Sequence, residues 1–457
     1  MDKLLSVGLD VGTTTTQLIV SELRVENKAS SFTVPELTIS DRKILYEGPV
    51  RFTPLIAGEL VDGEKIRELV KEDYAAAGIT PGQVNTGAVI ITGETSRKEN
   101  AKQVLNALSG FAGEFVVATA GPDLESVLAA KGAGAVDYAE KTGKTVLHMD
   151  IGGGTSNLAL IENGKIVKTG CLNVGGRLIK LDKTGAVTYL SPVLEGLCDL
   201  AVGEVPSETA LYRVAELLAR ALAMAAGLEP PTELLEQLST AEAGAVFTPC
   251  SADVISFSGG VADCIEKDLP LLAYGDIGVF LGRAIRASDL CKGEYRLGEQ
   301  TIRATVIGAG CHSAQLSGST VYHKGVALPR KNLPVAVLSM PVTAEKVAAA
   351  YAGQDHDTAV LAIPGYTAPT YEQVRQLAEA IAAGSGGREI LVCLEQDMAK
   401  ALGHALALSR PERPCLCIDR VRLTGESFLD IGLPVGPALP VVVKTLVLLK
   451  SSELEIK

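Results

Sequence analysis

One pattern occurs twice in the chain, and it constrains the fold more than any other feature of the sequence. GLDVGTTTTQLIV occupies residues 8–20, and HMDIGGGTSNLAL occupies residues 148–160. In both copies an apolar strand ends at an aspartate, a glycine follows, and hydroxyl side chains lead into a second apolar strand. Each copy therefore predicts a β-hairpin with a polar turn. Two equivalent hairpins in constant register predict two related half-domains.

The turn of each hairpin has the composition of a phosphate-binding site. A glycine permits backbone N–H groups to approach anionic oxygens, which neighbouring hydroxyl groups can also contact. An aspartate at the strand end can hold a hydrated magnesium ion beside the phosphates. No Lys-Ser or Lys-Thr follows the glycine, which excludes a Walker-type loop. If the two halves face each other across a cleft, both turns surround one polyphosphate.

The repeat gives the first set of predicted site residues. Asp10 and Asp150 are predicted to act in catalysis and to hold Mg²⁺, through water. The phosphate contacts are predicted to come from the turn residues Gly12, Thr13, Thr14, Thr15, Thr16, Gly152, Gly153, Gly154, Thr155 and Ser156.

Three more segments complete the predicted site. Gly175 and Gly176 precede an expected helix and permit close approach of backbone to ligand. The apolar strand at 254–261 closes with residues against which a flat ring and a ribose can lie, namely Ser258, Gly259, Gly260 and Val261. Glu125 follows Pro122 at the start of another expected helix and is predicted as a water-activating carboxylate. A simple N-terminal helix charge also explains Glu125, so both interpretations stay open.

Charge and composition limit the class of partner and the compartment. The chain has 457 residues and a formal net charge of -12, which argues against nucleic acid and anionic membranes as partners. Nine cysteines without a Cys-x-x-Cys pair indicate a reducing cytoplasm. Asp2 and Asp10 flank a short apolar run, which predicts a strand and not a signal peptide. The most apolar expected helix is interrupted by Arg220, so no membrane span is predicted.

The order of these features predicts an α/β protein with three parts. The first half-domain is expected at 1–145, with an inserted subdomain at about 21–85, and the second half-domain at 146–318. Short apolar strands then alternate with helices over 319–457, which predicts an additional C-terminal α/β region, a candidate for partner binding.

Residues 4 to about 318 resemble the nucleotide-binding core that actin, sugar kinases and the large heat-shock chaperones share. The resemblance rests on the order of hairpin, connecting helix, second hairpin, Gly-Gly strand and the small-residue helix at 275–284. It implies duplicated ribonuclease-H-like halves around a nucleotide cleft, with ATP and Mg²⁺ as cofactors. It also implies that the two aspartates hold magnesium through water and that 258–261 contacts adenosine.

The whole chain also resembles the reactivating factors of ethanolamine ammonia-lyase. The segments that carry this resemblance are GLDVGTTTTQLI, ITGETSRKENA, TAGPDLES, HMDIGGGTSNLALIENGKI, LNVGGRLIKLD, ISFSGGVAD and DIGLPVGPALPVVVKTL. The resemblance implies a chaperone that uses ATP to make the damaged lyase release its spent cobalamin, in the bacterial ethanolamine-utilisation microcompartment. No Asp-x-His-x-x-Gly stretch is present, so the corrinoid is expected on the lyase and not on this chain. A small-molecule kinase and a filament-forming actin relative remain as alternatives, and neither has a signature in the sequence.

Overall fold

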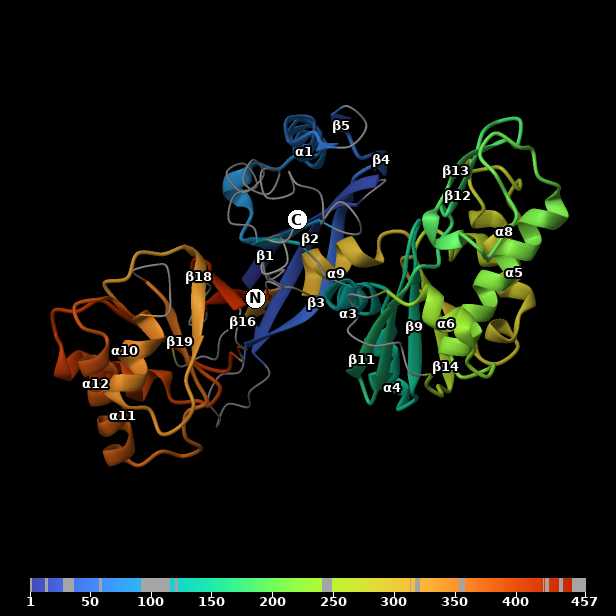
Figure 1. Cartoon of the computed structure of the whole chain (residues 1–457). Coiled ribbons are helices and arrows are strands. Elements are labelled where there is room, and N and C mark those ends of the chain that lie inside the picture. Colours follow the sequence, from blue (N-terminus) through green and yellow to red (C-terminus); the bar gives the residue numbers. More distant parts are fainter. Residues whose placement is uncertain are drawn as a thin grey trace, which may run out of the picture.

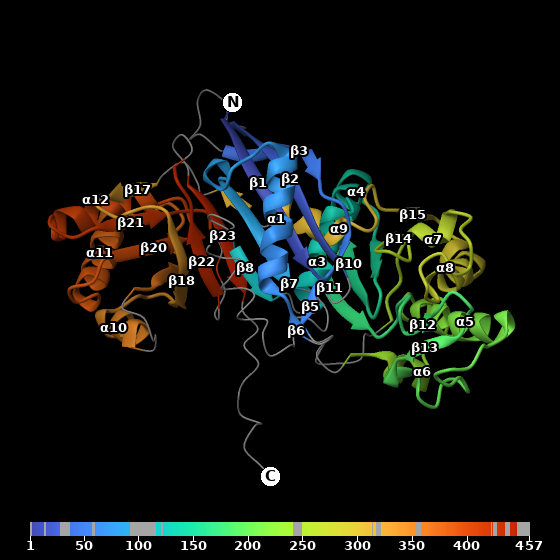
Figure 2. The same cartoon turned by 90° about the horizontal axis from the view of Figure 1, so that it is seen from above.

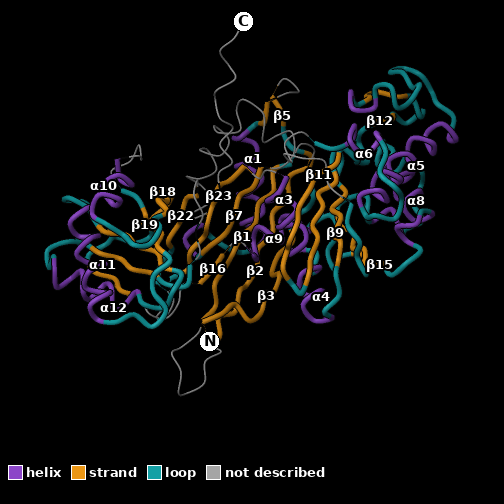
Figure 3. Tube along the Cα trace, turned by 60° about the horizontal axis from the view of Figure 1, so that its bottom comes forward, coloured by secondary structure: helices purple, strands orange, loops and turns teal. Residues whose placement is uncertain are grey.

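Three bodies follow one another along the molecule in the computed structural model (Figure 1). The first half-domain lies in the centre, with the second half-domain on one side and the C-terminal region on the other, as two further views also show (Figures 2 and 3). The structure describes residues 2–12, 15–27, 37–56, 60–91, 116–119, 122–240, 249–312, 314–316, 321–352, 358–421, 423, 427–434 and 439–445. Across these residues, every helix is too short or too polar to cross a membrane.

The first half-domain is built on a sheet with the strand order β3-β2-β1-β7-β8. Its first three strands are antiparallel neighbours, and the last two run parallel to β1. The strands are β1 (Asp2–Val11), β2 (Thr15–Asn27), β3 (Leu37–Glu47), β7 (Thr86–Ile91) and β8 (Val116–Thr119). The short strand β4 (Arg51–Phe52) pairs with the beginning of β2, beside the glycine turn.

The second half-domain repeats this sheet. Its order is β11-β10-β9-β14-β15, again with three antiparallel strands followed by two parallel ones. The strands are β9 (Val146–Ile151), β10 (Ser156–Glu162), β11 (Lys165–Leu172), β14 (Val254–Ser258) and β15 (Tyr295–Leu297). The same order and directions in both sheets confirm the predicted duplication of a ribonuclease-H-like half, the arrangement of actin-like ATPases.

The two glycine turns are equivalent in detail. The N–H of Gly12 donates to the carbonyl of Thr15 over 2.9 Å, and that of Gly152 donates to the carbonyl of Thr155 over 2.9 Å. Asp10 pairs with Gln17 across the first hairpin, as Asp150 pairs with Asn157 across the second. The repeat in the sequence is therefore a repeat in backbone geometry.

Helices and short strands cover these two sheets. In the first half they are β5 (Leu55–Ile56), β6 (Leu60–Val61), α1 (Gly63–Ala77) and the 3-10 turn Pro81–Gln83. Helix α3 (Pro122–Gly132) contacts β9, β10 and β11 of the second sheet, while its Leu128 packs with buried residues of the first sheet. The elements from α4 onward are α4 (Ala135–Thr142), β12 (Ile179–Leu181), β13 (Val187–Leu190), α5 (Glu208–Ala225), α6 (Glu233–Leu238), α7 (Asp263–Glu266), α8 (Gly278–Ala287) and α9 (Ala304–His312), with 3-10 turns at Pro192–Leu194 and Asp289–Cys291.

The strand pairing and the helix contacts differ from two of the expected boundaries. The insertion expected at 21–85 is smaller, because β2 continues to Asn27 and β3 pairs along it as part of the main sheet. Helix α9, which lies within the expected second half-domain at 146–318, packs against β1, β2 and β7 of the first half and against α3. The chain thus crosses back to its first half before the C-terminal region begins.

The C-terminal region has its own eight-stranded sheet, ordered β16-β23-β22-β18-β19-β20-β21-β17, with parallel pairing from β18 through β21. Its elements are β16 (Ala314–Leu316), β17 (Tyr322–Lys324), β18 (Arg330–Val337), α10 (Ala344–Ala352), β19 (Val360–Ile363), α11 (Tyr371–Gly384), β20 (Ile390–Leu394), α12 (Ala399–Ser409), β21 (Cys415–Ile418), β22 (Ser427–Ile431) and β23 (Pro440–Thr445). Because β16 belongs to this sheet, the region begins slightly before residue 319. It contacts the first half through β16 on β3 and β23 on β8.

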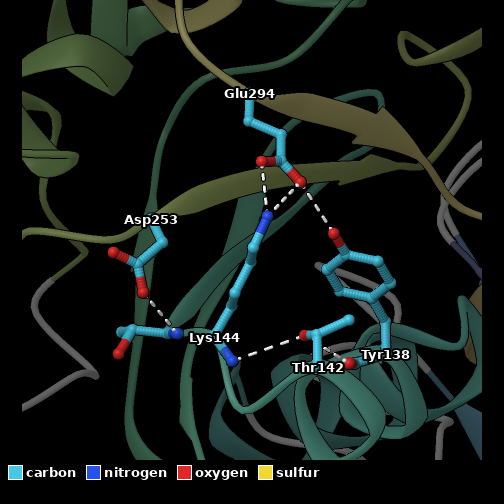
Figure 4. Close-up of polar contacts among 6 residues, drawn as sticks. Tyr138, Thr142, Lys144, Asp253 and Glu294 are labelled. Carbon is cyan, nitrogen blue, oxygen red and sulfur yellow. Dashed lines mark hydrogen bonds and ion pairs between the residues drawn. The ribbon is translucent and has the colours of Figure 1, made fainter.

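A cluster of polar contacts joins four elements of the second half-domain at the end of its sheet that lies away from the cavity (Figure 4). Lys144 Nζ donates to Glu294 Oε2 over 2.6 Å, and the Tyr138 hydroxyl donates to Glu294 Oε1 over 2.7 Å. The N–H of Thr145 donates to Asp253 Oδ2 over 2.9 Å. These contacts join α4 and the start of β9 to the segments entering β14 and β15, at the opposite end of β9 from Asp150.

Candidate functional site

A cavity lies between the two half-domains where the glycine turns meet. Its lining includes Asp10, Gly12, Thr15 and Gln17 of the first hairpin together with Asp150, Gly152, Gly153, Gly154, Thr155 and Asn157 of the second. The structure thus brings both predicted aspartates, both turns and two carboxamides around one space. Thr13 and Thr14 lie outside the described residues.

Two of the predicted phosphate contacts do not line this cavity. The Thr16 hydroxyl lies 3.1 Å from that of Thr53, and the Ser156 hydroxyl donates to the carbonyl of Val174 over 2.8 Å. Both side chains are buried. Successive side chains of a strand point to opposite faces. Thr15 and Gln17 face the cleft, as do Thr155 and Asn157, so Thr16 and Ser156 between them point to the other face. Their hydroxyls therefore stabilise the hairpins from behind.

Asp150 is held by hydroxyl groups from two other parts of the chain. Ser258 donates to Asp150 Oδ1 over 2.5 Å, and Thr305 donates to Oδ2 over 3.3 Å. Burial raises the pKa of Asp150, and these two hydrogen bonds oppose that shift. A buried carboxylate with hydroxyl donors at both oxygens is suited to a position beside a divalent cation, whose charge would compensate the buried negative charge.

Ser258 has a different place from the predicted adenosine contact. Its side chain is fully buried and lies between Asp150 and His148, whose Nε2 is 2.9 Å from the Ser258 hydroxyl. Burial lowers the pKa of His148 to about 3, so the imidazole is neutral. Ser258 therefore positions Asp150, while its neighbours Gly259, Gly260 and Val261 do line the cavity.

Glu125 lies in the cleft and not on a solvated helix face. It is 7% exposed, lines the cavity and accepts a hydrogen bond from Asn157 Nδ2 over 2.8 Å. The neighbouring acidic residue of the same turn, Asp123, is exposed and accepts from the Thr169 hydroxyl of β11 over 2.6 Å. Of these two carboxylates, only Glu125 is placed to reach a ligand in the cleft; its action on water stays a prediction.

The paired glycines, Gly175 and Gly176, have different roles in the structure: one lines the cavity and the other packs against a neighbouring loop. Gly176 lines the cavity, whereas Gly175 does not. A Cβ on Gly175 would lie 2.3 Å from the carbonyl oxygen of Gly153, and one on Gly259 would lie 2.2 Å from that of Ile151. Gly259 also has a φ of +87°, which favours glycine. Gly175 therefore permits its loop to lie directly against the second glycine turn.

Sequence reasoning missed several lining residues. Gln17 and Asn157 occupy equivalent hairpin positions, so the repeat itself held a signal for them. Gln17 Oε1 and Asn157 Oδ1 are buried and have no hydrogen-bond partner among the described residues. Such acceptors suit the waters of a hydrated cation. The other missed lining residues are Arg177, Asp263, Cys264, Tyr274, Asp276, Gly278, Ile302 and Thr305, which no local pattern marks.

Comparisons with known proteins agree along the whole chain. The profile of the family described as ethanolamine utilisation protein EutA matches residues 2–449. The ethanolamine ammonia-lyase reactivase EutA of Escherichia coli strain K12 is 38% identical over 469 residues, which cover 97% of this chain and 98% of that protein. The protein of the same name from Salmonella typhimurium strain LT2 is 39% identical over 466 residues, with the same coverage of 97% and 98%.

Solved structures are more distant. The Aquifex aeolicus PPX-GPPA enzyme is 14% identical with a TM-score of 0.42, and the match covers 67% of this chain and 99% of that one. The ethanolamine utilization protein EutJ from Carboxydothermus hydrogenoformans is 20% identical with a TM-score of 0.32, covering 68% and 90%. The profile match and the full-length relatives confirm the resemblance seen in the sequence, and the chain belongs to the family of ethanolamine utilisation protein EutA.

Proposed function

We propose that this protein is an ATP-dependent reactivating factor, a chaperone that releases damaged cobalamin from ethanolamine ammonia-lyase so that intact adenosylcobalamin can bind. The observation that carries this proposal is the likeness to two reactivases over 97% of the chain. The cleft between the duplicated halves supports the nucleotide part of the proposal.

The lining of the cleft fits a nucleotide with a magnesium ion. Asp10 and Asp150 would hold the ion through water, and the unpartnered amide oxygens of Gln17 and Asn157 can accept from those waters. The two glycine turns offer backbone N–H groups to phosphates, and residues 259–261 with Gly176 leave bare backbone for adenosine. When bound, magnesium would neutralise phosphate charge, and Glu125 would orient the attacking water.

The halves can convert nucleotide state into a change of shape. The start of α9 and the residues just before it contact both sides of the cleft. The carbonyl of Ile302 accepts from Gln17 Nε2 over 3.2 Å, and Thr305 of α9 donates to Asp150 over 3.3 Å. A ligand that changes the angle between the halves therefore moves this segment and the helix that follows it. We propose that residues from about 319 onward contribute to the lyase-binding surface and that the cleft controls the strength of that binding.

Two further parts of the proposal concern the setting of the reaction. The corrinoid is held by the lyase throughout, because the reactivating chain acts by binding and not by covalent chemistry. The protein works in the cytoplasm, in association with the ethanolamine-utilisation microcompartment.

Reactivation in a purified system tests the proposal. Lyase inactivated with bound damaged cobalamin is mixed with this protein, Mg²⁺, ATP and free adenosylcobalamin, and ethanolamine deamination is followed. Recovery of activity that requires both ATP and this protein is expected. Absence of recovery, or equal recovery without ATP, contradicts the proposal.

A further inference from the structure

Arg177 is the only lysine or arginine among the described residues that line the cleft. The same lining carries five carboxylates, those of Asp10, Glu125, Asp150, Asp263 and Asp276. A polyphosphate entering this space therefore meets mostly negative side chains, and Arg177 is the basic side chain that the described part of the lining offers it.

The backbone fixes Arg177 against the second phosphate turn. Its N–H donates to the carbonyl of Gly153 over 2.6 Å. A Cβ built on Gly153 would lie 3.2 Å from Arg177 Cδ, so the arginine side chain passes directly over this glycine. The guanidinium thus lies beside the turn that is predicted to bind phosphate, and a rotation of its own side chain can bring it to a bound anion.

The guanidinium has two neighbours in the structure. Nε lies 3.4 Å from Asp276 Oδ2, in the same half-domain. On the opposite side, the guanidinium carbon lies 5.9 Å from the ring centre of Phe52 in β4 of the first half-domain. Phe52 is 76% exposed and contributes nothing to a core. The contact with Arg177 is therefore a bridge across the mouth of the cleft.

Neither neighbour holds the guanidinium strongly. A cation–π contact at an exposed site is weak. Asp276 already accepts the N–H of Gly278 at Oδ1 over 2.8 Å, so it stays hydrogen-bonded when the arginine leaves. The guanidinium has five N–H donors, more than its ion pair with Asp276 requires. A phosphate oxygen is the acceptor class that such a planar, charged donor binds best.

We propose that Arg177 distinguishes ATP from ADP: its guanidinium binds the terminal phosphate of ATP and gives up Phe52, so that the bridge across the cleft mouth exists only without ATP. This inference rests on the proposed nucleotide function of the cleft and adds the residue through which the nucleotide state reaches the other half-domain. The lyase-binding form and the free form would then differ in whether Arg177 joins the two halves.

The test is nucleotide binding by the full chain, measured by calorimetry with Mg²⁺ and either ADP or a non-hydrolysable β,γ-imido analogue of ATP. Arg177→Gln is expected to weaken the ATP analogue at least about tenfold, because a charge-assisted hydrogen bond is lost, and ADP less than about threefold. Arg177→Lys, which keeps the charge without the planar fork, is expected to fall between wild type and Arg177→Gln.

Phe52→Ala separates the bridge from the phosphate contact. Removing the ring frees the guanidinium, so the ATP analogue is expected to bind about 2- to 5-fold more tightly while ADP affinity is unchanged. Ile56→Ala is the matched control on the same side of the mouth, because Ile56 is 51% exposed and outside the cavity lining. Lys180→Gln controls for charge near Asp276 and is expected to affect both nucleotides equally.

The outcomes separate two failures. If the wild-type chain binds neither nucleotide, the proposed function itself fails. If it binds both, and Arg177→Gln weakens them equally or neither, the assignment of Arg177 is wrong while the nucleotide site stands. If Arg177→Gln does not fold by circular dichroism, Phe52→Ala decides, and unchanged affinity for the ATP analogue overturns the inference.

Discussion

Asp150 and Asp10 are equivalent in the hairpins but differ in what surrounds them. Asp150 accepts hydroxyl groups from β14 and α9, and it is 8% exposed. Asp10 is half-buried at the matching position of the first hairpin. Both line the cleft. One ion with two carboxylate neighbours from separate half-domains would also hold those halves in register.

Loss of either aspartate is therefore expected to remove most ATP hydrolysis. Asp10→Ala and Asp150→Ala each delete a carboxylate that we propose holds Mg²⁺ and delete little core volume, so turnover is expected to fall at least about tenfold while the fold is kept. Phosphate release and far-ultraviolet circular dichroism measure the two effects. Asp137→Ala, at an exposed position of α4, is the control. Unchanged hydrolysis in both single variants would rule the assignment out.

Glu125→Gln is expected to keep nucleotide affinity and lower turnover by about 100-fold, because the amide keeps the size of the side chain but cannot accept a proton. Glu125 would still have a carbonyl-type acceptor for Asn157 Nδ2 after this change. Single-turnover hydrolysis together with nucleotide titration checks the prediction. Turnover at the wild-type rate would return Glu125 to the role of an N-terminal helix charge.

At the scale of elements, the two half-domains are joined by a close helix pair. A Cβ on Gly132 of α3 would lie 1.8 Å from the carbonyl oxygen of Ala304, and one on Gly308 of α9 would lie 2.0 Å from that of Leu128. These neighbours are backbone atoms, which cannot move away by a side-chain rotation. The small residues therefore set the distance between α3 and α9, and Glu125 and Thr305 at the ends of these helices share that geometry.

Gly308→Ala is expected to push α9 from α3 and to lower the free energy of unfolding by about 1–3 kcal/mol. Because Thr305 lies one turn earlier on α9, nucleotide affinity should fall as well. Urea denaturation measures the first effect. Gly293→Ala is the matched control, since nothing lies within 4 Å of its added Cβ. If Gly308→Ala and Gly293→Ala have the same free energy of unfolding, the contact between α3 and α9 can accommodate the added methyl group and the prediction is wrong.

The C-terminal sheet contains a buried carboxyl group with its own pH dependence. Asp419 follows β21 and is fully buried beside Asp397; burial is the main cause that raises its pKa from 3.8 to about 7. The folded protein therefore binds a proton that the unfolded chain releases at lower pH. Its stabilising contribution is complete below the unfolded pKa and is lost as pH rises to about 7.

Asp419→Asn is expected to reduce the dependence of stability on pH. The amide is neutral at every pH, so the stability of the variant relative to wild type should be greater at pH 8 than at pH 5. Thermal unfolding at the two pH values is the measurement. Asp268→Asn, whose side chain is 99% exposed, is the control. A wild type that gains stability relative to Asp419→Asn as pH rises would contradict the shifted pKa.

At the scale of the molecule, the proposed output is a difference in lyase affinity. The C-terminal region touches the first half-domain through β16 on β3 and β23 on β8. The second half-domain lies at the other side of the molecule (Figure 1). A surface on the C-terminal region can therefore sense the cleft through the first half-domain or through α9, which contacts β16.

Lyase binding is expected to differ between ATP, ADP and no nucleotide. A coupling of about 1–3 kcal/mol would change partner affinity roughly 5- to 150-fold. Binding is measured in the three states while labelled γ-phosphate is followed, with Asp150→Ala as the uncoupled control. Equal affinity in all three states, or label on any product except inorganic phosphate, would contradict the chaperone proposal and favour a kinase.

The sequence by itself determined those features of the protein that depend on short stretches of chain. The repeated hairpin indicated the two half-domains, the two aspartates and the glycine turns, because each depends on strand periodicity and on a turn within about a dozen residues. The alternation of strand faces also held the information that Thr15 and Gln17 face the cleft while Thr16 does not, although composition alone favoured the whole threonine run.

Only the tertiary structure decided which distant residues complete the site. Ser258 and Thr305 reach Asp150 from 108 and 155 residues away, and Arg177 meets Phe52 across two half-domains. The return of α9 to the first half likewise depends on helix packing against α3. Such contacts arise from the burial of whole faces and not from spacing along the chain, so no local pattern in the sequence could specify them.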